Sequence, residues 1–243
     1  MVALHETLRS EHIPFELVIV DDGSTDGTAE VGRRLTARHD AVVLVSNSGR
    51  HGFGMAVRKG LDFITGDAVA IVMADASDHP ADVVRCYQKL HEGYDCVFGS
   101  RFIEGGRVVD YPLHKLIVNR IANAVINLLF HLQFNDCTNA FKMYRRFVID
   151  GLQPLISPHF NLTVEMPLKA VVRGYSFAVI PITWTNRKHG VSKLKLKEMG
   201  SRYLFIVLYL WLERLLARND YHRRHLPAAG KVETAAKAET GHV

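Results

Sequence analysis

The arrangement of four short apolar runs in the first hundred residues limits most strongly what this chain can fold into. The runs span residues 16–21, 41–46, 68–73 and 95–99. Stretches with the spacing of amphipathic helices alternate with them, at residues 2–11, 26–38, 54–65 and 80–92. Strands that are apolar on both faces are typical of a parallel sheet covered by helices on each side. The sequence therefore predicts an α/β fold, with a mostly parallel sheet between two layers of helices.

Polar clusters follow three of these runs, and in such sheets ligands bind beyond the carboxyl ends of the strands. The clusters are Asp21-Asp22, Asp75 to Asp78, and Ser100-Arg101. The adjacent carboxylates of Asp21 and Asp22 can accept hydrogen bonds from a base edge and from ribose hydroxyls. The alternative is a turn that only caps the next helix, through Ser24 or Asp26.

The second cluster has the composition of a divalent cation site. Asp75 and Asp78 lie three residues apart at the end of a predicted strand. Two carboxylates there can hold one Mg²⁺ or Mn²⁺ against a diphosphate, because hard cations prefer oxygen ligands. Capping of the next helix by Ser77 or Asp78, ahead of Pro80, is the alternative. Capping accounts for Asp78 but not for Asp75.

The second half of the chain is richer in long helical stretches. Helices are expected at residues 112–134 and 161–173, a strand at 176–183, and a helix that is apolar all round from Ser201. The first and last of these helices combine apolar residues with Arg, Lys and aromatics, as helices in a membrane interface do. Alternatively, both are core or oligomer helices. No run reaches the ~18 apolar residues of a spanning helix.

Composition adds weaker constraints. The formal net charge is +5 and the isoelectric point about 9.1, which suits an anionic partner but also a merely basic surface. Three cysteines without a Cys-x-x-Cys spacing indicate neither a disulfide framework nor a zinc site, so reduced cytosolic thiols are expected. No signal peptide is recognisable at the N-terminus.

Six sequence motifs, in this order, resemble those of family 2 glycosyltransferases, and within them the dolichol-phosphate mannosyltransferase-like group. They are the Asp-Asp-Gly-Ser-Thr-Asp turn at 21–26, the loop at 47–56, Ala74-Asp75 ahead of Pro80, and residues 99–102, 136–142 and 190–194. The resemblance covers roughly residues 3–212. It implies a GT-A-type, Rossmann-like fold, with a catalytic domain over residues 1–200. The apolar run predicts an interfacial helix over 201–218, and the Ala, Lys, Glu and Thr content beyond it predicts a disordered tail over 219–243.

The resemblance also implies roles for individual residues. Donor-binding residues would be Asp21, Asp22, Asn47, Gly54 and Asp75. Catalytic residues would be Asp75, Asp78, Arg101 and Arg187. Asp75 and Asp78 would bind the metal, Mg²⁺ or Mn²⁺; Met73 stands where the family has the first Asp of an Asp-x-Asp motif, so this site is expected to be altered.

The acceptor phosphate would be bound by Lys115, Asn119, Ser192 and Lys193, the last two in a basic loop that folds over the donor in relatives. Lys115 and Asn119 are four residues apart, so they share one helix face. A solvated lysine is the alternative for Lys115. Asn139 and Glu165 match positions near the active site; a helix cap and a surface carboxylate are their alternatives.

The function implied is an inverting transfer of a sugar from a GDP- or UDP-linked donor to a polyprenyl or dolichyl phosphate. The protein would lie peripherally on the cytoplasmic face of a membrane, without a nucleic-acid partner, and its oligomeric state stays open. A polysaccharide or protein acceptor is the first alternative. A non-catalytic relic that binds donor or membrane is the second, because residues 1–12 already match the first helix and the family's opening Pro-x-x-Asn-Glu strand has no counterpart here.

Overall fold

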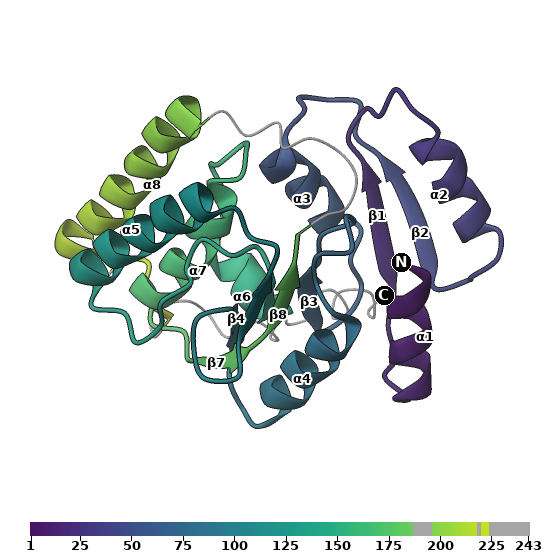
Figure 1. The fold of residues 1–243 in the computed structure, drawn as a ribbon, viewed down its shortest axis with the longest axis horizontal. Helices are drawn as coiled ribbons and strands as arrows, with labels where there is room; N and C mark the ends of the chain where they lie inside the picture. The colour runs from purple at the N-terminus through teal and green to yellow at the C-terminus, as the bar shows by residue number, and fades with distance from the viewer. Residues whose placement is uncertain (187–195, 218–219, 224–243) are drawn as a thin grey trace, which may run out of the picture.

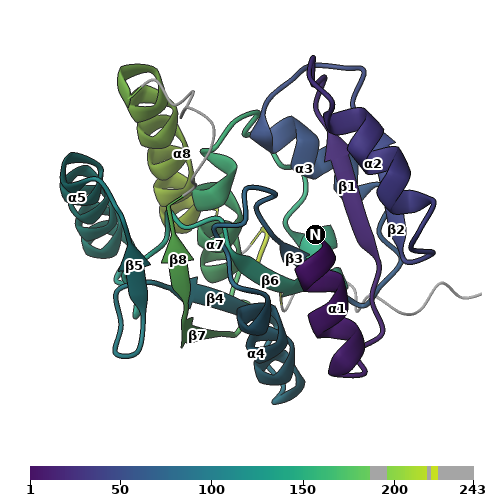
Figure 2. The ribbon, with the colours of Figure 1, turned by 45° about the vertical axis from the view of Figure 1, so that its right-hand side comes forward.

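The computed structural model describes residues 1–186, 196–217 and 220–223, with the side chains of 196–199 excepted, as an α/β fold (Figures 1 and 2). The first half comprises α1 (Val2–Ser10), β1 (Leu17–Asp21), α2 (Thr28–Thr36), β2 (Val42–Ser46), α3 (Phe53–Leu61), β3 (Ala68–Ile71), α4 (Pro80–His91) and β4 (Cys96–Ser100). The second half comprises β5 (Arg107–Val109), α5 (Leu113–Phe130), β6 (Lys142–Arg145), α6 (Arg146–Gly151), α7 (Leu162–Val172), β7 (Phe177–Pro181), β8 (Thr183–Thr185) and α8 (Leu196–Leu216).

The predicted alternation of helices and strands in the first half is confirmed. Three helix boundaries differ by four residues or more: α3 ends at Leu61 rather than residue 65, α5 ends at Phe130 rather than residue 134, and α8 begins at Leu196 rather than Ser201. The short elements β5, β6, α6 and β8 were not predicted, because three to six residues carry too little periodicity. The proposed disordered tail, residues 219–243, falls almost entirely outside the described residues.

The strands form three small sheets rather than one. β1 pairs in parallel with β2, and β5 in parallel with β8. The central sheet has the order β3-β6-β4-β7, in which β6 is antiparallel to both neighbours and β4 is parallel to β7. Within the described residues no strand pairs with the second edge of β1 or of β3. The single sheet expected from the sequence is therefore divided between β1 and β3 in the described structure.

Two apolar cores hold the layers together. One lies where β4 and β7 meet α5, α7 and α8, and it includes Phe98, Ile126, Phe130 and Leu210, all at most 3% exposed. The other packs α1 and α4 against β1, β4 and β6. The three cysteines are buried, unpaired thiols in these cores. Helices therefore cover both sides of the central sheet, as the strand composition predicts.

Helices α5 and α8 lie side by side on the left of Figure 1, with Arg214 of α8 donating to the Leu129 carbonyl of α5. Each helix buries one apolar row and exposes another. We call the exposed row the α5/α8 surface; it consists of Leu113, Ile117, Ile121, Val125, Leu128, Leu204, Phe205, Leu208, Leu212 and Leu215. No helix in the described part of the chain is both long and apolar enough to span a bilayer.

Candidate active site

The turn after β1 and the loop after β2 are joined through the carboxylate of Asp22. Its Oδ1 accepts from Asn47 Nδ2 at 2.6 Å and its Oδ2 accepts from the Gly52 amide at 2.7 Å. The backbone amide of Asn47 donates to the backbone carbonyl of Asp21, and the side-chain Oδ1 of Asp21 accepts from the backbone amide of Ser24. Three of the predicted donor-binding residues, Asp21, Asp22 and Asn47, therefore form one cluster. Asp26 Oδ1 accepts from the Thr28 backbone amide at 3.0 Å at the start of α2, whose N-cap is Gly27. The turn therefore contacts the start of this helix and is also joined to the loop after β2.

Gly54, the fourth predicted donor-binding residue in this region, is a site of close backbone approach. A Cβ atom at this position would lie 2.1 Å from the Ser157 carbonyl oxygen, and the following Met55 amide donates to the Pro158 carbonyl. Glycine is thus required because α3 begins against the loop that precedes α7. Gly54 would therefore influence donor binding indirectly, by fixing the position of α3.

Asp75 and Asp78 follow β3, and their carboxylates are close enough for Asp75 to raise the pKa of Asp78. Asp75 Oδ1 accepts from the Ser77 amide, and Asp78 Oδ2 accepts from the Met73 amide at 3.0 Å. Ala76 between them has a left-handed backbone, with φ of 59°. The alternative that Asp78 or Ser77 caps α4 is wrong, because the cap is His79, whose ring accepts from the Ala81 amide.

This turn fits a divalent cation. The Ser77 hydroxyl is buried and finds no partner among the described residues, so an unsatisfied oxygen lies in the same turn as the two carboxylates. The described residues hold no group of three or more His, Cys, Asp or Glu side chains able to bind a metal. Mg²⁺ commonly takes one or two carboxylates and completes its shell with water and substrate phosphates. Asp75 and Asp78 match that mode of binding.

The burial of Asp78 leads to a pH-dependent prediction. Burial is the largest cause that raises its pKa, from 3.8 to about 6. The native state then holds more protons than the unfolded state between these values, so stability falls as the pH rises through that window. In EDTA, Asp78→Asn is expected to be more stable than the wild type above pH 7, by roughly 3 kcal/mol, with no difference near pH 3.5. Urea unfolding at both pH values measures this; an equal effect at both would contradict it.

Arg101 at the end of β4 is buried and bound to a carboxylate from a distant loop. Its Nε and Nη2 donate to the two oxygens of Asp136, each at 2.7 Å, and its backbone amide donates to the same side chain. The rings of Phe102, Tyr111 and Trp184 surround the guanidinium at 5.1 to 5.8 Å. Asp136 takes two of the five N–H groups of this guanidinium, and the Tyr111 hydroxyl is a further hydrogen-bond neighbour. Its predicted catalytic role is untested, and its position is set by Asp136.

The loop that carries Asp136 also contacts α5, where the predicted acceptor residues lie. Asn119 and Asn123 both donate to the Thr138 hydroxyl, at 2.7 and 3.0 Å. The Asn123 oxygen accepts from the Thr138 amide. Lys115, one turn before Asn119, is exposed. This loop therefore connects the helix proposed to bind the acceptor with the arginine at the end of β4.

A buried lysine also stabilises this loop, by hydrogen bonds to its backbone carbonyls. Lys142 donates to the carbonyl oxygens of Cys137 and Asn139, and its burial lowers its pKa to about 8. Asn139 itself donates to the Gly99 carbonyl and does not precede a helix, so the helix-cap alternative for Asn139 is wrong. Hydrogen bonds to α5, to Arg101 and to Lys142 thus hold this loop in place.

Glu165 in α7 is fully buried, so the surface-carboxylate alternative is wrong. Its oxygens accept from the amides of Ile156 and Ser157, and it forms an ion pair of 2.7 Å with Lys169. It orders the loop before α7, against which Gly54 packs. Arg187, Ser192 and Lys193, the predicted lid residues, lie outside the described residues.

Several residues of this site were not assigned a role from sequence. Asp136 and Lys142 belong to a recognised motif, but no local pattern shows that they bind Arg101 and the loop carbonyls. Tyr111 lies two residues after β5, Trp184 is the middle residue of β8, and their rings are 5.0 Å apart. Nothing in the local sequence around these two aromatic residues indicates that their rings contact the Arg101 guanidinium.

Comparison with known proteins gives a consistent result. The family model for glycosyl transferase family 2 matches residues 2–152. A polyprenol monophosphomannose synthase from Mycolicibacterium smegmatis is 32% identical over 184 residues, which are 73% of this chain and 69% of that protein. A dolichol-phosphate mannosyltransferase from Pyrococcus furiosus is 29% identical over 189 residues, 76% of this chain and 52% of that protein. The chain thus spans about half the length of the second relative.

Solved structures show the same fold. A glucosyl-3-phosphoglycerate synthase from Mycobacterium tuberculosis, in complex with Mn²⁺, UDP and phosphoglyceric acid, superposes with a TM-score of 0.60 and 18% identity. The match covers 87% of this chain and 72% of that one. The complex of this synthase with Mg²⁺ and UDP gives a TM-score of 0.57 and 20% identity, over 82% of this chain and 68% of that one. At this identity the likeness establishes the GT-A fold and nothing finer.

Proposed function

The chain belongs to glycosyl transferase family 2, and from this premise we propose that it transfers a sugar from a nucleotide-sugar donor to a polyprenyl phosphate. The names of the two curated relatives support this acceptor. The observation that carries the proposal is the loop of Asp136 and Thr138. It connects Arg101, beside the Asp75–Asp78 turn, to Asn119 on α5, so that a donor diphosphate and an acceptor phosphate have neighbouring binding groups.

The residues of this site have distinct parts in the proposed reaction. Asp21, Asp22 and Asn47 position the nucleoside. Asp75 and Asp78 would hold Mg²⁺ or Mn²⁺, which would supply positive charge for the departing diphosphate. Lys115 and Asn119 position the acceptor phosphate. That phosphate is already anionic at neutral pH, so it attacks the anomeric carbon with inversion and without a strong general base. Most of the rate enhancement then comes from positioning and charge stabilisation.

The α5/α8 surface supports binding to a membrane, where a polyprenyl phosphate resides. Ten exposed apolar residues on two adjacent helices exceed the scattered apolar residues of an ordinary surface. Arg120 and Arg202 lie on the same helices, as suits helices at the depth of lipid headgroups. We place this peripheral contact on the cytoplasmic face, in line with three unpaired cysteine thiols.

The membrane contact leads to a prediction about single charges. Ile121→Glu on α5 and Leu208→Glu on α8 are each expected to lower the affinity for phospholipid vesicles by about tenfold or more, because a buried side chain of this size contributes about 1.5–3 kcal/mol. Val31→Glu is the matched control, since Val31 is 47% exposed on α2 at the opposite side of the molecule (Figure 1). Vesicle flotation measures all three. Equal binding of Val31→Glu and Leu208→Glu would contradict this contact.

The function is tested by incubating the purified chain with Mn²⁺, a polyprenyl phosphate in vesicles, and radiolabelled GDP-mannose, UDP-glucose or UDP-N-acetylglucosamine. Label is expected in the organic phase, as a polyprenyl-phosphate sugar, with one of these donors. A label that enters a polysaccharide or protein instead would support the first alternative acceptor. If no label is transferred from any donor, the proposal fails.

A further inference from the structure

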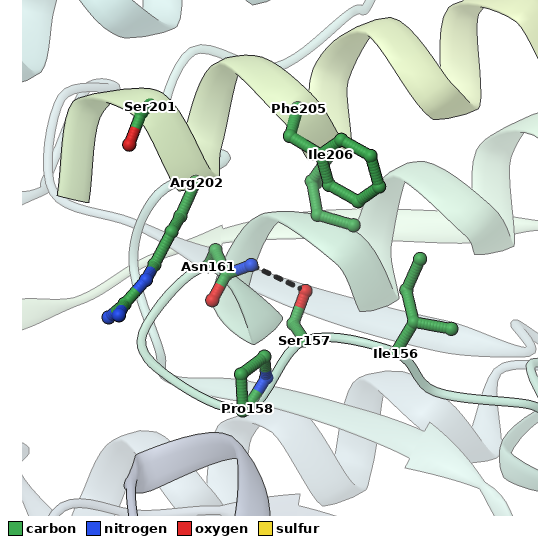
Figure 3. Close-up of a pocket in the computed structure, with 8 residues that line it drawn as sticks. All are labelled: Ile156, Ser157, Pro158, Asn161, Ser201, Arg202, Phe205 and Ile206. Atoms are coloured by element: carbon green, nitrogen blue, oxygen red, sulfur yellow. Dashed lines mark hydrogen bonds between the residues drawn. The ribbon is translucent and has the colours of Figure 1, made fainter. Parts of the chain in front are cut away.

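A cavity of about 300 Å³ lies between the loop that precedes α7 and the first turns of α8 (Figure 3). Ile156, Ser157 and Asn161 line it from the loop, and Arg202, Phe205 and Ile206 line it from α8. Phe205 belongs to the α5/α8 surface and is 61% exposed, so the cavity opens beside that surface. None of these residues has a role in the proposed sugar transfer.

The cavity contains an unsatisfied hydrogen-bond acceptor. Asn161 is only 3% exposed, and its Nδ2 donates to the Ser157 hydroxyl at 2.9 Å. Its Oδ1 has no partner within the described structure and, in Figure 3, points away from Ser157 toward the side along which Arg202 extends. A buried carbonyl oxygen without a partner costs free energy, and a ligand that brings an O–H donor removes this cost.

The other lining residues define the rest of the ligand. The guanidinium of Arg202 favours an anionic group, and phosphate is a good match for its geometry. Phe205 and Ile156 offer apolar contact at the opening, and the exposed row continues along α8 through Leu208 and Leu212. The ligand therefore combines a hydroxyl donor, a phosphate and hydrocarbon. An ionised polyprenyl phosphate has only acceptor oxygens and leaves Asn161 unsatisfied.

We propose that this cavity binds the headgroup of an anionic phospholipid that carries hydroxyl groups, as phosphatidylglycerol does. The hydroxyl donates to Asn161 Oδ1, the phosphodiester lies against Arg202, and the acyl chains follow the exposed row of α8. This inference rests on the membrane contact in the proposed function. It adds a headgroup preference to a contact that is otherwise only apolar and electrostatic.

The test compares phosphatidylglycerol with phosphatidylmethanol, each at the same fraction in phosphatidylcholine vesicles. The two anionic lipids carry the same charge, but the methyl headgroup has no hydroxyl. The full chain is expected to bind the phosphatidylglycerol vesicles about three- to tenfold more tightly, the value of one hydrogen bond. Asn161→Leu should remove this preference, and Arg202→Gln should weaken binding to both vesicles equally.

Asn127→Leu is the matched control, because Asn127 on α5 also has a buried, unpartnered Oδ1 but does not line the cavity. It should keep the preference. The wild-type chain gives a test that needs no variant: soluble glycerophosphoglycerol should reduce binding to phosphatidylglycerol vesicles to the level of phosphatidylmethanol.

Three outcomes overturn the proposal in distinguishable ways. Equal binding of the wild type to both anionic vesicles eliminates the headgroup site and leaves the sugar transfer and the membrane contact standing. No binding to any vesicle eliminates the membrane contact of the proposed function as well. A preference that survives in Asn161→Leu, provided its melting temperature matches the wild type, also contradicts the proposed site.

Discussion

Asp75→Asn is expected to lower the rate of sugar transfer by about 10²–10³-fold, the typical effect of removing one group that stabilises charge in a transition state. The substitution keeps the size of the side chain and removes one of the two carboxylates that we propose hold the cation beside the donor diphosphate. Asparagine can still accept the hydrogen bond from the Ser77 amide, so the turn should keep its shape. Initial rates at saturating donor and acceptor, over a range of Mn²⁺ concentrations, measure the effect.

Asp62→Asn is the matched control for this substitution. Asp62 is an exposed carboxylate at the end of α3, 4.0 Å from Lys59 and outside the site. It should transfer sugar at the wild-type rate. If Asp75→Asn also stays within about threefold of the wild type, Asp75 is not a metal ligand in this reaction, because a lost ligand has a larger effect.

Asp136→Asn is expected to destabilise the protein by about 3–5 kcal/mol, because it leaves Arg101 buried without its counter-charge. The pair is bidentate, and both side chains are at most 6% exposed. Sugar transfer should fall as well, even under conditions where the variant is folded, because the position of Arg101 and the loop to α5 depend on this carboxylate. Urea unfolding and initial rates measure the two effects separately.

Two further variants sharpen this prediction. Glu30→Gln breaks the exposed pair of Glu30 with Arg33 and should leave the stability unchanged. The double variant Arg101→Met with Asp136→Leu removes both charges, so it should recover much of the lost stability but not the activity. Recovered activity in the double variant would show that the arginine has no part in transfer.

The strands of the first half could be predicted because each is an uninterrupted apolar run of four to six residues. β6 could not, since it begins with Lys142, and a fully buried lysine contradicts the rule by which buried strands are recognised. The order β3-β6-β4-β7 could not be predicted either. It places β6, more than forty residues beyond β4, between β3 and β4, and no local pattern encodes that pairing.

The candidate site was predictable where its residues are neighbours in sequence. Asp21 with Asp22, and Asp75 with Asp78, follow strands and meet at turns whose shape is set locally. The pairing of Arg101 with Asp136 spans 35 residues, and the burial of Glu165 depends on packing between α7 and the loop before it. A charged residue in a sequence does not reveal whether water or a counter-ion faces it.

The central proposal is that one site transfers the sugar of a nucleotide-sugar donor to a lipid phosphate. Its most direct measurement is the release of nucleoside diphosphate by the purified chain, followed with and without polyprenyl phosphate in the presence of Mn²⁺. Release with one donor is expected to require the polyprenyl phosphate, to match the lipid-linked sugar formed mole for mole, and to be lost in Asp75→Asn. Release that proceeds at the same rate without the lipid, or no release with any donor, would contradict the claim.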